Sequence, residues 1–176
     1  ADLSTFFFAC NYGEVQRTKP LLLGGGQGIH RFYSNLSRLF PWISPKSYEL
    51  SISNVLGKSI EIGEISVQAA KVNHKRESIG IRLESGTFKS VVFSGDTDYS
   101  ANLARISREA DVLVADCAFP EKKVKGHLNL EFLDKIVKKV QPKKVVLSHL
   151  YPDWDEFRGI LHAPYLMAED GMEIEL

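Results

Sequence analysis

The chain has little of what marks several protein classes. Its 176 residues include only two cysteines, Cys10 and Cys117, which are too few and too far apart for a disulfide framework. This favours a reducing, cytoplasmic environment. No apolar run approaches the roughly 20 residues of a membrane-spanning helix, and the first residues lack the charged-then-apolar pattern of a signal peptide. We therefore expect no membrane partner.

An excess of one charge is lacking too. Lys plus Arg and Asp plus Glu both number 22, so no global field draws the chain towards nucleic acid or anionic lipid. Lysines do gather within 122–125 and 135–144, which we interpret as a solvated face, with a nucleic-acid patch as the alternative. At 44% hydrophobic and 25% charged residues, the composition is that of a globular protein. The length suits one domain over residues 1–176.

The hydrophobic pattern predicts a mixed α/β protein. Apolar residues at helical spacing predict helices at 3–12, 29–40, 100–109 and 128–140. Period-two patterns predict antiparallel strands at 48–53, 59–62, 65–72, 78–84 and 88–94. Further strands are predicted at 20–23, 112–115, 145–147, 165–167 and 172–176. A strand meander that passes into strand–helix alternation predicts a sheet core covered by helices.

One glycine-rich loop, Gly24-Gly25-Gly26-Gln27-Gly28, lies between a predicted strand and a predicted helix. A helix N-terminus with free N–H groups can bind phosphate. The loop does not fit G-x-G-x-x-G, because Ile29 stands where the third glycine belongs, and no Lys-Ser/Thr follows it. We interpret it as a tight connection that needs glycine's positive φ; nucleotide binding is the alternative.

Five residues able to bind metal or move protons fall at the ends of predicted elements. Four of them follow predicted strands: His74, Asp96, Asp116 and His149. The fifth, His127, opens a predicted helix. Ligands gather beyond the carboxyl ends of strands in open α/β sheets, and imidazole and carboxylate suit divalent metals. The sequence therefore predicts a metal site on one rim. The alternative is that these are ordinary caps, turn residues and surface histidines.

The same residues carry a family resemblance. Gly95-Asp96-Thr97 resembles the Gly-Asp-Thr motif of the metallo-β-lactamase-fold hydrolases. His74 resembles the histidine before the family's Gly-Tyr-Arg strand, and Ser148–Pro152 resembles its last histidine loop. Residues 115–119 and 126–128 resemble the His-Glu-Ala-Thr and Gly-His-Ser-Thr segments of the ribonuclease Z branch.

The resemblance implies a fold and a mechanism. The fold is the αββα four-layer sandwich with its N-terminal part missing. His74, Asp96 and His149 are expected to bind two zinc ions, with manganese or iron tolerated, and Asp96 to bridge them. The ions would activate water as hydroxide. His127, oriented by Asp116, is expected to donate a proton to the leaving oxygen. Expected substrates are phosphodiesters, either small molecules or nucleic acid.

Three departures qualify this expectation. The family's His-x-His-x-Asp-His motif is absent, so we expect the chain to begin just after it and to hold an incomplete metal site. Asp116 replaces a glutamate, and Leu128-Asn129 replaces Ser-Thr. Only 21 residues separate His74 from Asp96, which leaves no room for a tRNA-clasping arm. The alternative function is an inactive truncated fragment that oligomerises or binds a partner. Because missing strands would expose a sheet edge, a homo-oligomer is expected.

Overall fold

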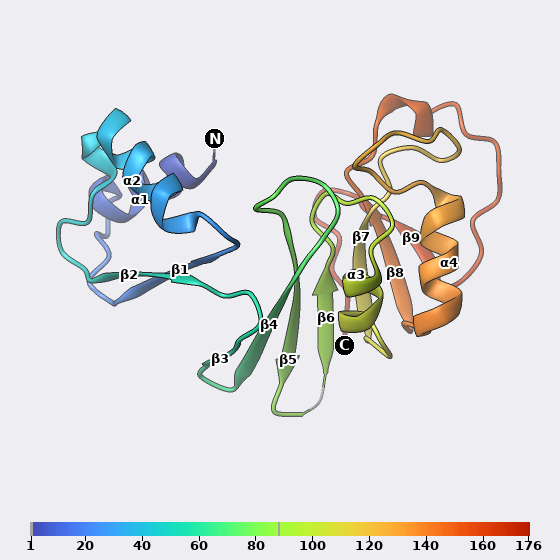
Figure 1. Cartoon of the computed structure of the whole chain (residues 1–176), viewed down its shortest axis with the longest axis horizontal. Helices are drawn as coiled ribbons and strands as arrows, with labels where there is room; N and C mark the ends of the chain where they lie inside the picture. Colours follow the sequence, from blue (N-terminus) through green and yellow to red (C-terminus); the bar gives the residue numbers. More distant parts are fainter. Residues whose placement is uncertain (1, 88) are drawn as a thin grey trace. The chain divides into compact units, whose positions relative to one another are not determined.

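The computed structural model describes residues 2–87 and 89–176 and contains two compact units, Ala1–Asn54 and Val55–Leu176 (Figure 1). Each unit is described separately below, and the expectation of one domain over residues 1–176 stays a prediction. Across the described ranges, no helix is long and apolar enough to cross a membrane.

The first unit is a small helix-covered strand pair. Its elements are α1 (Asp2–Tyr12), β1 (Leu21–Gly25), α2 (Ile29–Leu39), the 3-10 helix η1 (Pro41–Ile43) and β2 (Leu50–Asn54). β1 and β2 pair in parallel, so the prediction that residues 48–53 join an antiparallel meander is wrong. Parallel partners need a crossover, and α2 supplies it. Phe7, Ile43 and Tyr48 form the buried core.

The glycine-rich loop makes the tight connection expected of it. Gly28 precedes α2 with a φ of 95°, in the left-handed region that favours glycine. A Cβ on Gly25 would lie 2.8 Å from the side chain of Ile29. Close packing of the strand on the helix therefore explains the glycines.

The second unit is built on a seven-stranded sheet in the order β3-β4-β5-β6-β7-β8-β9. In chain order its elements are β3 (Ser59–Ile62), β4 (Ile65–Lys71), β5 (Ile79–Ser85), β6 (Ser90–Phe93), α3 (Ala101–Ile106), β7 (Val112–Asp116), α4 (Leu130–Val140), β8 (Lys144–Ser148), the 3-10 helix η2 (Pro152–Trp154) and β9 (Tyr165–Met167). The strands from β3 to β6 are antiparallel and those from β6 to β9 are parallel. The predicted mixed α/β class is confirmed.

The strand directions bring distant residues to one edge of this sheet. β4 and β6 both run antiparallel to β5, so they share a direction, and β7 and β8 run parallel to β6. The carboxyl ends of β4, β6, β7 and β8 therefore lie at the same edge. His74, Asp96, Asp116 and His149 stand at or just beyond those four ends.

The core beneath that edge is apolar and closely packed. β7 and β8 are nearly continuous apolar runs, as expected of parallel strands covered on both faces. α4 buries Leu133, Ile136, Val137 and Val140, one face at helical spacing. The Asn129 side chain accepts the Phe132 N–H at 3.0 Å and caps this helix. Rigid strands thus support the loops above them.

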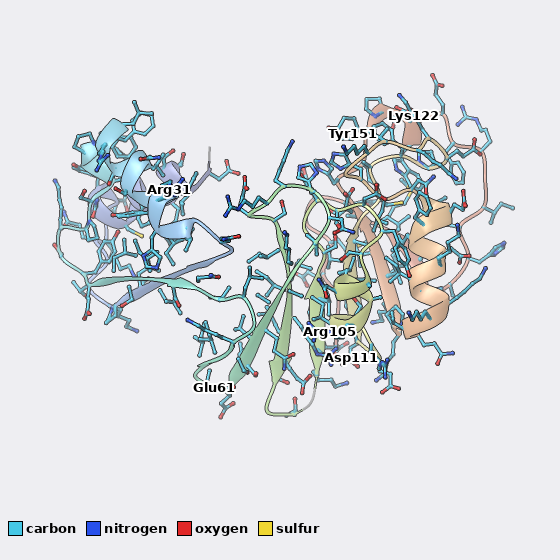
Figure 2. The ribbon with its side chains drawn as sticks, viewed as in Figure 1. Arg31, Glu61, Arg105, Asp111, Lys122 and Tyr151 are labelled. Atoms are coloured by element: carbon cyan, nitrogen blue, oxygen red, sulfur yellow. The ribbon has the colours of Figure 1, made fainter. Side chains whose placement is uncertain are left out.

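At the opposite edge of the sheet, the side chain of Asp111, the residue before β7, joins neighbouring strands (Figure 2). Its carboxylate accepts the Ser90 N–H at 2.8 Å and the Lys143 ammonium at 2.8 Å. These residues precede or open β7, β6 and β8. The Lys143 hydrogen bond, followed by that of Ser90, lowers the pKa of Asp111 to about 2. The starts of three parallel strands are therefore joined by one ionised side chain.

Some predicted boundaries need correction. No strand forms at residues 172–176, where Met172 and Leu176 remain 40% and 47% exposed. Their alternating pattern has no neighbouring strand to pack on. The helix predicted to run to Glu109 ends at Ile106, and Glu109 turns the chain with a φ of 52°. The predicted start of a strand at Phe88 lies outside the described residues, and β6 begins at Ser90.

Candidate metal centre

One ring nitrogen of His74 makes a hydrogen bond that holds the ring, and the other can bind a ligand. Its Nδ1 lies 3.1 Å from the carbonyl oxygen of Gly126. A carbonyl only accepts, so Nδ1 carries the hydrogen and the neutral ring has its lone pair on Nε2. That nitrogen faces the Asp96 carboxylate at 3.9 Å. Fixing a histidine through its far nitrogen is how proteins prepare a metal ligand.

Gly126 brings that carbonyl close enough. Its φ is 92°, and a Cβ added there would lie 2.7 Å from Nδ1 of His74. Both the backbone conformation and the close approach therefore require glycine. The His74–Gly126 contact links the loop after β4 to the loop before α4, 52 positions apart in sequence.

Asp96 projects from a constrained turn after β6. Gly95 has a φ of 58°, and a Cβ there would lie 2.8 Å from the carbonyl oxygen of Ile79. The Asp96 side chain is 45% exposed, so its carboxylate faces open space. It lines a cavity of about 350 Å³ together with Asp116 and His149.

Asp116 and His127 form a buried hydrogen-bonded pair. Asp116 Oδ2 accepts from Nδ1 of His127 at 3.1 Å and from the Thr97 N–H at 2.9 Å. Oδ1 accepts the Ala118 N–H at 3.1 Å. Burial raises the pKa of Asp116, although the Thr97 N–H and His127 act to lower it. The carboxylate fixes the His127 ring and leaves Nε2 for other chemistry.

The three histidines lie in a row. The ring centroids of His74 and His127 are 5.1 Å apart, and those of His127 and His149 are 5.3 Å apart with nearly parallel planes. His149 directly follows β8 and has a φ of 60°. Left-handed conformation is costly for a residue with a Cβ and is often found at functional sites. All five residues predicted from sequence therefore meet at one edge.

The left-handed backbone of His149 should lower the stability of the fold, while its imidazole supplies a metal ligand. Glycine relieves the left-handed strain, so we expect H149G to be about 1 kcal/mol more stable than H149A, which lacks the ring but keeps the Cβ. Both should lose the same metal affinity, because neither has an imidazole. Urea unfolding and zinc titration of the two variants check this. Equal stabilities would mean that His149 is not strained.

Sequence reasoning missed several supporting residues. Thr97 donates its N–H to Asp116 and accepts the Asn73 N–H through its hydroxyl at 3.0 Å. The Ser94 hydroxyl accepts the Asp116 N–H at 2.7 Å. The Tyr151 ring lies 5.4 Å from the His149 ring. Thr97 and Tyr151 could have been found from their motifs, whereas the role of Ser94 depends on a contact between β7 and the loop after β6.

A cation fits between His74 and Asp96. Nε2 of His74 carries a lone pair, and the carboxylate is also an acceptor. Their 3.9 Å separation is too long for a hydrogen bond. Two ligand atoms bonded to one tetrahedral zinc ion at ~2.0–2.2 Å lie about 3.4 Å apart, so a small closing movement would let one ion bind both side chains. Within residues 2–87 and 89–176, no three His, Cys, Asp or Glu side chains are grouped to hold an ion by themselves. This pair would thus supply two ligands and leave other coordination positions to further groups.

Comparison with known proteins places this geometry in a family. A family model described as the beta-lactamase superfamily domain matches residues 28–150. The uncharacterized protein ML1173 of Mycobacterium leprae is 26% identical over 121 residues, 61% of this chain and 42% of that protein. The probable metallo-hydrolase YhfI of Bacillus subtilis is 23% identical over 155 residues, 85% of this chain and 60% of that protein. The chain thus spans less than two thirds of either relative.

Solved structures agree in fold. The crystal structure of YhfI superposes with a TM-score of 0.75 at 18% identity, covering 97% of this chain and 71% of that one. The short form of human tRNase Z gives a TM-score of 0.70 at 16% identity, covering 93% and 70%. The expected fold is thereby confirmed. The chain belongs to the β-lactamase superfamily and has the metallo-β-lactamase fold.

Proposed function

We propose that the protein is a metal-dependent hydrolase of phosphodiesters. The observation that carries this proposal is the meeting of His74, Asp96, His127 and His149 at one sheet edge, with the rings of His74 and His127 oriented through their Nδ1 atoms. Chance surface histidines have no reason to share this orientation. The family membership and the likeness to YhfI support the same proposal.

The ligands in this proposal are His74, Asp96 and His149. His74 and Asp96 face each other, and Asp96 and His149 line one cavity, so Asp96 is suited to bridge two ions. Zinc is the metal proposed first, because imidazole and carboxylate are its usual ligands; a mixed site of this kind also accepts manganese or iron. When bound, such ions supply Lewis-acid charge and lower the pKa of water.

The proposed proton donor is His127. Asp116 holds its Nδ1, so Nε2 can carry a proton and release it to a leaving oxygen. The His127 side chain is only 14% exposed, which limits exchange of that proton with bulk water. In this scheme Asp116 acts on the leaving group only through the imidazole and is a positioning residue. Phosphodiesters are proposed as substrates on the likeness to tRNase Z, whether small molecules or nucleic acid.

Replacing Asp96 with asparagine tests the metal assignment. D96N removes the charge that would bridge two ions, so we expect zinc affinity to fall at least tenfold. Cleavage of bis(p-nitrophenyl) phosphate should fall at least 100-fold. Zinc competition against a chromophoric chelator and the release of p-nitrophenol measure the two effects. A parallel assay with p-nitrophenyl acetate separates phosphodiester from carboxylic-ester chemistry.

The exposed turn residue Asp170 offers a matched control, since D170N makes the same chemical change away from the site. It should retain the wild-type zinc affinity and rate. If D96N binds zinc as tightly as D170N does, Asp96 is not a ligand. If the acetate ester is cleaved and the phosphodiester is not, the proposed substrate class is wrong.

A further inference from the structure

A second cavity adjoins the candidate metal centre and has the opposite electrostatic character. It has a volume of about 550 Å³ and is lined by His74 and Gly126 from the centre itself. Its other charged lining residues are Lys71, Lys75, Arg76, Lys125 and Asp98. Four basic side chains thus face one acid, in a chain whose formal net charge is 0. This positive region is therefore a local feature.

The three lysines of this cavity differ from the lysines of α4 in their ion pairing. Lys135 pairs with Glu131 at 2.8 Å, and Lys138 pairs with Asp134. In the described part of the chain, none of the recorded ion pairs involves Lys71, Lys75 or Lys125. Their charges are therefore available to an anion from outside.

The loops that form the walls of the cavity are joined by hydrogen bonds. The Asn73 N–H donates to the Thr97 hydroxyl at 3.0 Å, and its side-chain amide donates to the Tyr99 carbonyl at 2.7 Å. The Asp98 N–H donates to the Asn73 carbonyl at 2.9 Å. The loop after β4 is thereby bound to the loop after β6, and the His74–Gly126 hydrogen bond adds the third loop. The backbone that carries the three lysines is therefore held in place before a ligand binds.

The two cavities meet at the His74–Asp96 pair. His74 lines the basic cavity, Asp96 lines the cavity that also contains Asp116 and His149, and the two side chains are 3.9 Å apart. The acidic side attracts cations and the basic side attracts anions. A substrate with its scissile phosphate at the metal centre could therefore extend another charged group into the basic cavity.

Resting on the proposed function, we propose that this cavity binds a second, non-scissile phosphoryl group of the substrate through Lys71, Lys75 and Lys125. The natural substrate is then a phosphodiester with at least two phosphoryl groups, such as a nucleotide derivative or an oligonucleotide. Lysine is a point-charge ligand for phosphate, and each such contact makes binding more sensitive to salt. A neutral ester would gain nothing from these side chains.

Direct anion binding tests this without requiring hydrolysis. Equilibrium binding of pyrophosphate to the metal-free protein is measured at two salt concentrations in chelator-resin-treated buffer. The triple variant K71Q/K75Q/K125Q should bind at least tenfold more weakly and with a smaller salt dependence. The control triple K89Q/K139Q/K144Q removes three exposed lysines elsewhere and should bind as the wild type does.

A variant that should bind pyrophosphate more tightly provides a test that misfolding cannot mimic. D98N removes the acid of the cavity and should tighten pyrophosphate binding several-fold. In cleavage assays, adding a 3′-phosphate to p-nitrophenyl thymidine 5′-phosphate should lower KM. The triple variant should not show this decrease in KM. Its kcat for the ester without the 3′-phosphate should equal that of the wild type. Competition by a dinucleotide and by a longer oligonucleotide distinguishes a small-molecule source from a nucleic-acid source.

The outcomes separate this inference from the proposed function. If both triple variants bind pyrophosphate equally, or D98N weakens binding, the cavity is not an anion site, whatever the cleavage assays show. If binding follows the lysines but the wild-type protein neither binds zinc nor cleaves the phosphodiester, the anion site stands and the hydrolase assignment fails.

Discussion

Replacing Gly126 with alanine should weaken zinc binding by about 10- to 100-fold, the cost typical of losing a group that orients a metal ligand. The new Cβ would lie 2.7 Å from Nδ1 of His74, so the ring or the loop must move. Either movement breaks the hydrogen bond to the Gly126 carbonyl and turns Nε2 away from Asp96. Zinc titration measures the affinity, and long-range ¹H–¹⁵N spectra of the imidazole show whether His74 keeps the hydrogen on Nδ1.

Gly57 provides a closely matched control. It has a φ of 71°, and a Cβ there would meet nothing within 4 Å. G57A therefore carries a similar left-handed penalty, about 1–2 kcal/mol, without a clash. Both variants should lose stability, but only G126A should lose zinc affinity. If G126A binds zinc as G57A does, the position of His74 does not depend on this carbonyl.

The fold was predictable where local pattern determines structure. The period of apolar residues located β3, β4, β5, β7 and β8 to within a residue or two. For β7 and β8 the reason is burial, whereas β3 is mostly exposed. Pairing direction was not predictable in the same way. Residues 48–53 show the alternation of an antiparallel strand, yet β2 pairs in parallel with β1. The alternation of 172–176 was equally misleading, since a pattern does not show whether a neighbouring strand exists.

The site could be predicted in its chemical groups but not in its supports. His74 and Asp96 were identifiable because each follows a strand, and the shared direction of β4 and β6 brings them together. Gly126 belongs to the segment that resembles Gly-His-Ser-Thr, but its contact with His74 could not be predicted, because the two residues are 52 positions apart. The basic cavity could not be predicted either, because Lys71 ends β4 and Lys125 lies in the loop before α4, in a lysine cluster that the sequence assigns to a solvated face.

A second large effect is expected at Asp116, whose role is to join the loop after β6 to the loop between β7 and α4. Its carboxylate accepts hydrogen bonds from Thr97, Ala118 and His127, and the side chain is 1% exposed. D116A would leave three buried donors without an acceptor, at about 1–3 kcal/mol for each unsatisfied group. Because such losses are not additive, we expect unfolding to become easier by about 3–5 kcal/mol, the range for breaking a buried charged pair.

Tryptophan fluorescence can measure this loss in the second unit alone. The chain has two tryptophans, and the buried Trp154 donates its indole N–H to the Cys117 carbonyl at 2.7 Å, next to Asp116. In a W42F background, urea unfolding followed by fluorescence therefore reports on the site. D170A, at an exposed turn, should change the free energy of unfolding by no more than about 0.5 kcal/mol. A D116A protein as stable as D170A would show that the two loops are held without this carboxylate, and the orientation of His127 would then need another cause.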